Sequence, residues 1–429
     1  MTAMIRVCVY PAQNESAVEI NNALSNCEGV EVFGIASIRG HNEFNFVNYT
    51  FAFPQIDDPD FEERFQAFLD EYGIDIVFPT NDSCVVFFAK NKDKFSARIV
   101  NSDYHSALIC NDKRKTYELF KDCNFCPRVY SQEDIQYPCF IKPAEGEGAI
   151  GAKIIKSPSE ADISQLKDYV VLEYLPGEEM TVDCISDRHN SLIKVLPRKR
   201  EKVFSGMSVY GRTVFPDKEI LGIAQTINDR LKLSGLWYFQ IKKDASGVSK
   251  LLEISMRCAG TMCQTRARGY NLPLLSVYTA LGKDIDAVDN SYSVIIDRTL
   301  FARYRTDLSF NTVYIDYDGT IVVKGKACLS IIRFLYQCKN CGKRIVMISR
   351  HNEDHDNTLE ADMVLHGISK DLFDDIICLT FSDEKYSVIT ESESIFIDNS
   401  FFERNKVAKR KGIPVFGVEN VDVLQDWRL

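Results

Sequence analysis

The chain has 429 residues, which is enough for about three domains of ordinary size. Hydrophobic residues make up 45% of it and charged residues 26%, a balance that excludes a disordered, collagen-like or coiled-coil protein. The net charge of −10 argues against nucleic acid or an anionic membrane as a partner, because both need a basic face on the protein.

The beginning of the chain and its cysteines bear on the compartment of the protein. The apolar stretch in MTAMIRVCVYPAQNES is too short for a signal peptide, and no apolar run reaches the ~20 residues that span a bilayer. Several of the 14 cysteines lie inside apolar runs, as buried thiols do in a reducing compartment. The pairs Cys123/Cys126 and Cys338/Cys341 lie outside glycine-rich knuckles, which favours structural cysteines over a zinc site. We therefore expect a cytoplasmic protein.

Two regions with different patterns make up the first part of the chain. In residues 1–108, short apolar strands alternate with segments of helical period, which predicts a small parallel α/β domain. In residues 109–305, a capped helix near Asn111 is followed mainly by strands, which predicts an α+β domain. The expected strands are 5–10, 30–37, 75–80 and 97–102 in the first region, and 139–144, 152–156, 170–175 and 180–186 in the second, followed there by SLIKVLPRKR, LWYFQIKKD and KLLEISMR.

The third region, residues 310–429, returns to a strict alternation of strands and helices. Nearly continuous apolar strands joined by helices predict a doubly wound parallel sheet. A stretch without strong periodicity near 284–312 separates this region from the second. The fold class is therefore multidomain, with an α/β, an α+β and a doubly wound part. The expected strands of the third region are 312–318, 344–349, 375–380, 394–399 and 413–418.

A glycine-rich segment in the second region has the spacing GxGxxG of a dinucleotide-binding loop. The residues after Gly146, Gly148 and Gly151 continue as a strand instead of starting a helix, so we reject a dinucleotide site. A glycine turn between antiparallel strands can instead fold its backbone N–H groups over a triphosphate, with Lys142 near a phosphate oxygen. A hairpin tip with a surface lysine is the alternative.

The segments that follow favour a nucleotide site. VVLEYLPGEEMTVD reads as a strand, a hinge and a second strand, so that an adenine ring can lie on the hinge while Glu179 holds the ribose. Glu253, Ser255 and Arg257 alternate along one strand and therefore share a face. With Gln240 of the preceding strand, they can hold Mg²⁺ and a phosphate together. A solvated surface strand is the alternative, which the apolar setting of KLLEIS disfavours.

These motifs resemble those of the ATP-grasp enzymes, in the branch that includes carbamoyl-phosphate synthase and biotin carboxylase. The resemblance implies a pre-ATP-grasp domain (1–108), an ATP-grasp domain (109–305), and ATP with Mg²⁺ (or Mn²⁺) as ligands. It also implies that Arg257 braces the transferred phosphate and that Gln240, Glu253 and Ser255 are metal ligands. The ATP-binding residues that it implies are Lys113, Lys142, Gly146, Gly148, Gly151, Glu173, Tyr174, Leu175 and Glu179.

Two positions depart from the family pattern, which often has glutamate in place of Gln240 and asparagine in place of Ser255. Gln240 and Ser255 each keep an oxygen that can bind a metal. Glutamine lacks the negative charge of glutamate, however, so we expect one tightly held metal ion more than two. The implied chemistry is activation of a carboxylate as an acyl phosphate, which an amine or a thiol then attacks. Candidate anchors for the substrate carboxylate are Arg200, Arg266 and Arg268, and each is equally explained by a surface ion pair.

The third region carries a second motif at the end of an apolar strand, Asp316-Tyr-Asp318-Gly-Thr. Two carboxylates at this spacing project to the same side, which is costly unless a cation lies between them. Ser349 and Asp398 end later strands, and Lys385 lies in the loop before the last of these. The carboxyl ends of parallel strands therefore carry the candidate side chains.

This third region resembles the haloacid dehalogenase-like (HAD-like) phosphatases. By that resemblance Asp316 is the nucleophile and Asp318 the general acid/base. Ser349 and Lys385 would hold the phosphate. The implied ligands of Mg²⁺ are Asp316, Asp318 and Asp398.

Three features of the third region depart from that pattern or limit it. Asn399 follows Asp398 where the pattern often has paired acids, and Lys370 competes with Lys385 for the same role. The span between Thr320 and the next strand is mostly one helix, so we expect no large cap domain. The phosphatase site would then be open.

We expect a bifunctional enzyme, an ATP-dependent carboxylate–amine or carboxylate–thiol ligase joined to a Mg²⁺-dependent phosphatase of the same pathway. Its partners would be small carboxylates and amines, a phosphorylated metabolite and, by the resemblance, a second copy of the chain. Two alternatives are a ligase with an inactive C-terminal lid or oligomerisation domain, and a nucleotide-sensing regulator without turnover. ATP binding without ADP formation would identify the regulator.

Overall fold

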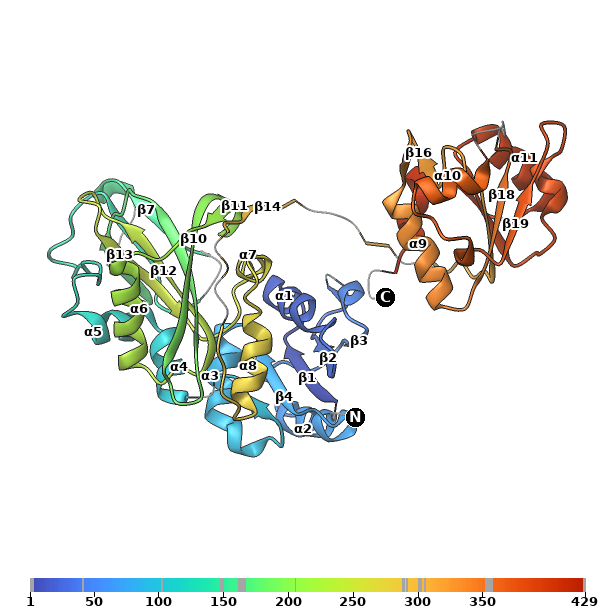
Figure 1. Cartoon of the computed structure of the whole chain (residues 1–429). Coiled ribbons are helices and arrows are strands. Elements are labelled where there is room, and N and C mark those ends of the chain that lie inside the picture. The colour runs from blue at the N-terminus through green and yellow to red at the C-terminus, as the bar shows by residue number, and fades with distance from the viewer. Residues whose placement is uncertain are drawn as a thin grey trace. The chain divides into compact units, whose positions relative to one another are not determined.

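The computed structural model describes residues 4–40, 42–101, 103–146, 150–160, 167–204, 206–287, 290, 292–299, 303–304, 306–351 and 358–426. The chain forms two compact units, Met1–Leu300 and Phe301–Leu429, which carry their own sheets (Figure 1). None of the helices in these described ranges is long and apolar enough to cross a membrane.

The first unit begins with a five-stranded parallel sheet in the order β3-β2-β1-β4-β5. The strand order reverses between β1 and β4, so the carboxyl ends of these two strands form the position where ligands bind in such sheets. The strands are β1 (Ile5–Tyr10), β2 (Val30–Ile35), β3 (Asn48–Thr50), β4 (Ile76–Pro79) and β5 (Arg98–Ile99), and the helices are α1 (Glu15–Leu24), α2 (Phe61–Tyr72) and α3 (Asp82–Asn91).

Two antiparallel sheets follow in the same unit, after α4 (Tyr104–Asn111) and α5 (Lys113–Phe120). A three-stranded sheet has the order β7-β6-β8, with β6 (Cys139–Pro143), β7 (Lys153–Ile155) and β8 (Tyr169–Glu173). A six-stranded sheet has the order β13-β12-β9-β10-β11-β14. Its strands are β9 (Glu179–Ser186), β10 (Leu192–Phe204), β11 (Met207–Thr213), β12 (Gly235–Lys243), β13 (Ser249–Ser255) and β14 (Ile295–Asp297), and the remaining helices are α6 (Lys218–Arg230), α7 (Cys263–Ala267) and α8 (Leu272–Ala280).

One hydrophobic core joins the parallel sheet to the six-stranded sheet. It contains Val9 of β1, Ile76 of β4, Leu196 of β10, Leu236 of β12 and Val277 of α8. Burying these side chains together holds the carboxyl ends of β1 and β4 against the six-stranded sheet.

The second unit is a five-stranded parallel sheet in the order β19-β18-β15-β20-β21. Its central strand β15 pairs with β18 on one side and β20 on the other, so the strand order again reverses beside the first strand. A short antiparallel hairpin, β16 with β17, follows β15. The elements are β15 (Thr312–Ile315), β16 (Val322–Val323), β17 (Lys326–Ala327), α9 (Leu329–Asn340), β18 (Arg344–Ser349), α10 (Leu359–Leu365), β19 (Asp375–Cys378), β20 (Ser394–Ile397), α11 (Phe401–Lys411) and β21 (Val415–Phe416).

Two predicted strands are much shorter in the structure than the pattern suggested. In the segment 97–102, β5 ends at Ile99 because Asn101 adopts a positive φ of 54° and its side-chain amide donates to the carbonyls of Leu236 and Met256. In the segment 413–418, β21 begins only after Pro414, whose nitrogen cannot donate to a neighbouring strand. Local side-chain and proline effects therefore override the apolar pattern at both places.

Candidate active sites

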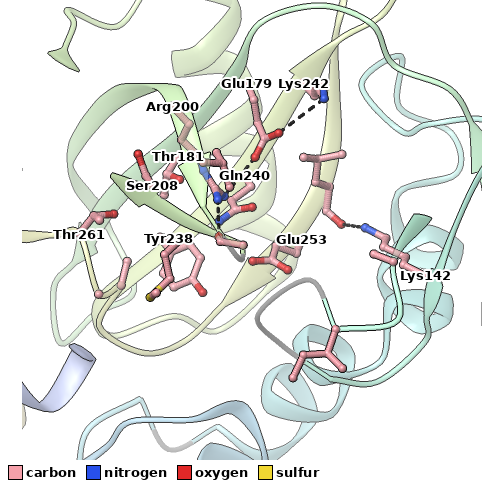
Figure 2. Close-up of a pocket in the computed structure, with 18 of the residues that line it drawn as sticks. Lys142, Glu179, Thr181, Arg200, Ser208, Tyr238, Gln240, Lys242, Glu253 and Thr261 are labelled. Atoms are coloured by element: carbon pink, nitrogen blue, oxygen red, sulfur yellow. Dashed lines mark hydrogen bonds and ion pairs between the residues drawn. The ribbon is translucent and has the colours of Figure 1, made fainter. Parts of the chain in front are cut away.

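A cavity of about 740 Å³ lies against the six-stranded sheet of the first unit (Figure 2). Residues that face each other on neighbouring strands point to the same side of a sheet. Arg198 is paired with Thr181, Thr181 with Gln240, and Gln240 with Glu253. All four line the cavity, so this row of side chains forms its floor.

Two lysines reach the cavity from the side of the three-stranded sheet. Lys142 of β6 is 7% exposed and donates from Nζ to the carbonyl of Leu252 at 2.7 Å. Burial lowers the pKa of Lys142 to about 7, while the Glu253 carboxylate opposes this shift and the Lys113 ammonium adds to it. Lys113, at the start of α5, donates from Nζ to the carbonyl of Gly146 at 2.8 Å. Two ammonium groups therefore line the cavity where an anion can meet them.

The glycine-rich loop joins two antiparallel strands, β6 and β7, as its sequence predicted. The loop leads into β7 and not into a helix, which agrees with the rejection of a dinucleotide site. Gly146 and Gly151 have φ values of 118° and 76°, which glycine adopts readily. A Cβ atom on Gly151 would lie 2.8 Å from the Tyr169 hydroxyl. Gly148 lies outside the described residues.

The hinge between β8 and β9 forms another wall of the cavity. Glu179 forms ion pairs with Arg200 at 3.1 Å and with Lys242 at 3.6 Å, so two cations already balance this carboxylate. Gly177 donates its N–H to the carbonyl of Lys243 at 2.9 Å, and a Cβ atom there would lie 2.6 Å from that of Lys243. The close approach of the two segments therefore requires a glycine. The hinge residues that line the cavity are Glu173, Tyr174 and Leu175.

The polar side chains of β13 and of the residues after it lie at the cavity and against Asp82. Glu253 and Arg257 line the cavity, and Arg257 lies over the Tyr238 ring at 5.6 Å. Ser255 is 2% exposed and donates its hydroxyl to Asp82 at 2.5 Å. Ser255 is not part of the cavity wall, but its hydroxyl and the Arg257 guanidinium contact the same Asp82 carboxylate, Arg257 at 3.4 Å.

The three candidate anchors for the substrate carboxylate lie in three different places. Arg200 lines the cavity, and its Nε is buried without a hydrogen-bond partner. Arg266 binds Glu19 in two hydrogen bonds of 2.7 and 3.1 Å and is not in the cavity wall. Arg268 lines a second, separate cavity. Only Arg200 is therefore positioned in this cavity.

Sequence reasoning missed several residues that line the same cavity. Arg198 is almost fully buried and binds Asp183 through Nε at 2.8 Å and Nη2 at 3.0 Å. Its position two residues before Arg200 on one strand was a signal that could have found it, because such residues share a face. Other missed cavity residues are Lys242, Arg298, Asn14 and Thr80.

Asn14 and Thr80 connect the cavity to the parallel sheet. Asn14 follows β1 and Thr80 follows β4, and the Asn14 amide donates to the Thr80 hydroxyl at 2.9 Å. Both residues lie at the carboxyl ends where the strand order reverses. The cavity therefore extends from the glycine-rich loop to this edge of the parallel sheet.

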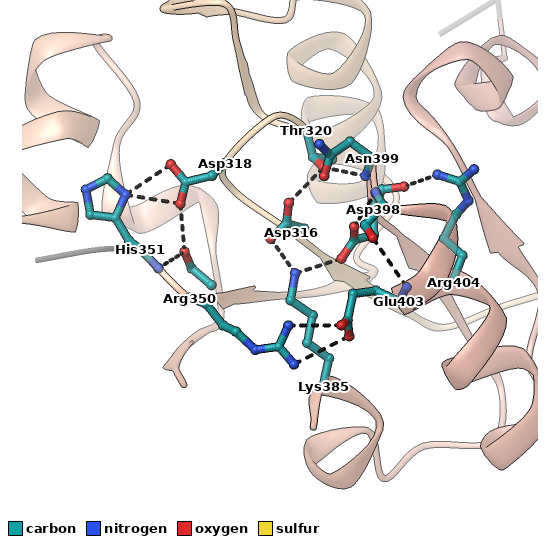
Figure 3. A network of polar contacts seen from close by, with 12 residues as sticks. Asp316, Asp318, Thr320, Arg350, His351, Lys385, Asp398, Asn399, Glu403 and Arg404 are labelled. Atoms are coloured by element: carbon teal, nitrogen blue, oxygen red, sulfur yellow. Dashed lines mark hydrogen bonds and ion pairs between the residues drawn. The ribbon is translucent and has the colours of Figure 1, made fainter. Parts of the chain in front are cut away.

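A second cluster of polar side chains lies at the carboxyl ends of the strands in the second unit (Figure 3). Lys385 donates from Nζ to Asp316 at 2.6 Å and to Asp398 at 2.7 Å. The Thr320 hydroxyl donates to the other Asp316 oxygen at 2.9 Å. Asp316, Lys385 and Asp398 are all nearly fully buried. One ammonium group therefore joins two carboxylates that lie 82 positions apart in the sequence.

Asp318 lies on the exposed side of this cluster, and its side chain is 53% exposed. His351 contacts both oxygens of Asp318 through Nδ1 at 3.1 Å. The Ser349 hydroxyl is 3.4 Å from Asp318 and accepts a hydrogen bond from the backbone of His351 at 3.0 Å. Sequence reasoning missed His351 and the role of Thr320, although Thr320 belongs to the DxDGT motif itself.

The buried charges of the cluster affect one another. Burial raises the pKa of Asp316 to about 6, the nearby Asp398 charge adds to this shift, and Lys385 and Thr320 oppose it. Burial alone would lower the pKa of Lys385, but Asp316 and Asp398 raise it above its ordinary value. The lysine therefore carries its charge while it holds the two acids.

Across the described residues, no three His, Cys, Asp or Glu side chains are grouped so that they could hold a metal ion, so the expected ligand set of Asp316, Asp318 and Asp398 is not gathered in the structure. Mg²⁺ commonly takes only one or two protein carboxylates and completes its shell with water and phosphate oxygens. Gln240 with Glu253, and Asp316 with Asp398, are oxygen donors of this kind. Both pairs therefore fit Mg²⁺ only together with a phosphate-bearing ligand.

Part of the first unit matches proteins of known family. Residues 165–299 match a family model described as ATP-grasp in the biosynthetic pathway with Ter operon. Over 139 residues the chain is 27% identical to D-alanine–D-alanine ligase of Thermotoga petrophila, which covers 29% of this chain and 46% of that protein. Over 219 residues it is 25% identical to the carbamoyl phosphate synthase large chain of a Thermoanaerobacter species, with 45% and 20% covered. The chain spans less than half the length of these two relatives.

The first unit also shares its fold with solved structures. The biotin carboxylase domain of Hydrogenobacter thermophilus 2-oxoglutarate carboxylase superposes with a TM-score of 0.55 and 16% identity, over 66% of this chain and 71% of that one. That domain was solved as a dimer with MgADP, ADP and bicarbonate. At this identity the likeness concerns the fold alone. Residues 165–299 therefore match an ATP-grasp family model, and the first unit shares the fold of that biotin carboxylase domain.

Proposed function

We propose that the first unit is an ATP-dependent ligase that joins a small carboxylate to an amine, or less often to a thiol, through an acyl phosphate. One observation carries the proposal: Lys142, Gln240, Glu253 and the hinge line a single cavity. The family match and the similarity to D-alanine–D-alanine ligase support it.

The side chains of the cavity suit the parts of ATP in different ways. Lys113 and Lys142 would neutralise phosphate oxygens, and the backbone of the hinge would bind adenine. Glu179 would bind the ribose hydroxyls. Gln240 and Glu253 would hold Mg²⁺, which neutralises phosphate charge when bound. Ser255 leaves this set because its hydroxyl is engaged with Asp82.

In the proposed first step, a carboxylate oxygen of the substrate attacks the γ-phosphorus of ATP, and the bond from that phosphorus to the β–γ bridging oxygen breaks. ADP leaves with the electron pair. The amine then attacks the acyl carbon, loses a proton to solvent, and inorganic phosphate leaves. Lys142 and Arg257 would stabilise charge on the transferred phosphoryl group, and Arg200 would orient the carboxylate.

The ligase proposal is tested by ADP release from MgATP with pooled carboxylates and pooled amines. We expect ADP formation that depends on the pools in the wild type and in a control variant of an exposed glutamate, Glu63→Ala, and its loss in Glu253→Ala. Splitting the pools would then identify the substrates. ATP binding without ADP formation from any pool would contradict the ligase and favour a nucleotide-sensing regulator.

We further propose that the second unit is a Mg²⁺-dependent phosphatase that acts in the same pathway on a phosphorylated metabolite. Its support is the cluster of Asp316, Lys385 and Asp398 with Asp318 and Ser349 beside it. The Asp316 carboxylate would attack the phosphorus of the ester while Asp318 gives a proton to the leaving alcohol. Water would then release phosphate from Asp316, with Asp318 taking its proton.

The phosphatase proposal is tested by hydrolysis of p-nitrophenyl phosphate with Mg²⁺ and after addition of EDTA. Asp316 and Asp398 would hold Mg²⁺, which assists attack by neutralising phosphate charge. We expect hydrolysis that EDTA abolishes and Mg²⁺ restores. Hydrolysis unaffected by EDTA would contradict the metal assignment, and no hydrolysis of this or any phosphorylated metabolite would favour an inactive C-terminal domain. The expected homodimer is measured by light scattering of the purified chain.

A further inference from the structure

A second cavity, of about 660 Å³, lies in the first unit and shares no described lining residue with the cavity of the proposed ligase. It lies at the beginning of β10, beside α6 and the segment that follows α7. Its described wall contains two cations and no Asp or Glu. The lining residues are Leu192, Ile193, Lys194, Val195, Leu196, Phe215, Pro216, Leu221, Gln225, Arg268, Tyr270 and Asn290.

Arg268 is the buried cation of this cavity. It is 4% exposed, and its guanidinium carbon lies 4.3 Å from the centre of the Phe215 ring and 5.7 Å from that of Tyr270. Its hydrogen bonds to the carbonyls of Val214 and Asn290 are long, 3.4 and 3.3 Å. Its Nε is buried and has no hydrogen-bond partner. In the described part of the chain, no carboxylate forms an ion pair with it.

Two other buried or half-buried arginines of the same unit are paired with a carboxylate. Arg198 binds Asp183 through two nitrogens, and Arg266 binds Glu19 in the same way. A buried cation without an anion is costly, because the surrounding protein replaces only part of its hydration. Arg268 therefore differs from Arg198 and Arg266 in having no carboxylate partner in the described part of the chain.

The surroundings of Arg268 indicate the kind of anion that would fill this role. Aromatic rings against the guanidinium engage its faces, and the Nε–H that has no partner, together with an Nη–H not used by the two carbonyls, suits a planar, two-oxygen acceptor. Leu192, Phe215 and Leu221 make much of the wall around Arg268 apolar. Inorganic phosphate would gain little from such apolar walls.

We propose that this second cavity binds a small organic carboxylate with an apolar body, with Arg268 as its anchor. The proposal is independent of the ligase chemistry, because no lining residue is common to the two cavities. Sequence analysis offered Arg268 as an anchor for the carboxylate of the ligase substrate. In this proposal Arg268 binds a different carboxylate, in a separate cavity.

The test uses phenylacetate as the probe and calorimetric titration of the full chain saturated with MgADP. Phenylacetamide is the neutral control, and inorganic phosphate tests an anion without an apolar body. We expect phenylacetate to bind the wild type and the Arg200→Met variant alike. Arg268→Met should lower its affinity by about tenfold or more, since a charge-assisted hydrogen bond is lost.

The unfolding temperature without any added carboxylate separates a ligand-binding role of Arg268 from a structural one. Removal of an unpaired buried cation should leave that temperature unchanged or raise it in Arg268→Met. The proposal is overturned if phenylacetate does not bind the wild type, if it binds Arg268→Met equally well, or if phosphate or phenylacetamide binds as tightly. A large loss of stability in Arg268→Met would also overturn it, because Arg268 would then be structural.

Discussion

Lys142 donates a hydrogen bond of 2.7 Å to the carbonyl of Leu252, the residue immediately before Glu253. This bond fixes the lysine of β6 beside the carboxylate of β13 across 110 positions of sequence. Burial lowers the pKa of this lysine to about 7, against the opposing effect of Glu253. The charge that would meet ATP therefore depends on pH near neutrality.

The affinity for MgATP should fall as the pH rises above the pKa of Lys142. In the free protein the lysine loses its proton above about pH 7, and a bound phosphate must restore that proton. Between about pH 7.5 and about pH 9 we expect the Kd to rise by up to about tenfold per pH unit. Lys142→Arg should flatten this dependence, because arginine stays charged. Calorimetry at several pH values measures it, and parallel profiles for both proteins would contradict the prediction.

Changing the proposed metal ligands of the first unit should weaken ADP formation in one variant and reduce its Mg²⁺ requirement in the other. Glu253→Ala removes the carboxylate and should lower the rate by at least about a hundredfold. Gln240→Glu places a second carboxylate opposite Glu253 and should lower the Mg²⁺ concentration needed for half-maximal rate. Steady-state kinetics with varied Mg²⁺ measures both effects. An unchanged Mg²⁺ requirement in Gln240→Glu would argue against this ligand pair.

Asp316→Asn should abolish hydrolysis of p-nitrophenyl phosphate and leave ADP formation unchanged. The amide is a poor nucleophile, and it also breaks the ion pair with Lys385. Asp371→Asn, which changes an exposed aspartate of the same unit, is the matched control. Circular dichroism shows whether the variant is folded. Loss of both activities from Asp316→Asn alone would mean one composite site instead of two.

The buried pair of Arg198 and Asp183 should dominate the stability of the sheet under the first cavity. Asp183 accepts hydrogen bonds from Arg198 and, at 2.6 Å, from Thr265. Asp183→Ala leaves a buried guanidinium without its anion and should lower the free energy of unfolding by about 3–5 kcal/mol. The double variant Asp183→Leu/Arg198→Met should recover most of this loss. Urea denaturation measures both, and equal losses in the two proteins would refute the argument.

Alternation along strands predicted which residues share a face, and neighbouring strands then completed the sites. Glu253 meets Gln240 through the antiparallel register of β12 and β13. Asp316 and Asp398 follow β15 and β20, which are paired in parallel. In each case an apolar strand with a polar end was visible in the sequence, because burial of the strand imposes that pattern.

Partners far apart in the sequence could not be predicted in the same way. Ser255 had the correct spacing for a ligand, but Asp82, which lies 173 positions away, engages its hydroxyl. The sequence offered Arg266 and Arg200 equally as anchors, but in the folded chain Arg266 is bound to Glu19. A residue type states which bonds a side chain can form, whereas the tertiary fold decides which of them are already formed.

The division of the chain after Leu300 also affects how the two units can recombine during evolution. Every described residue of the cavity of about 740 Å³ precedes this boundary, and Asp316, Lys385 and Asp398 follow it. A recombination event there would transfer either set of reactive groups whole. Natural selection can therefore retain, replace or discard one proposed activity without rebuilding the other, and relatives that carry only one unit are the expected products of such events.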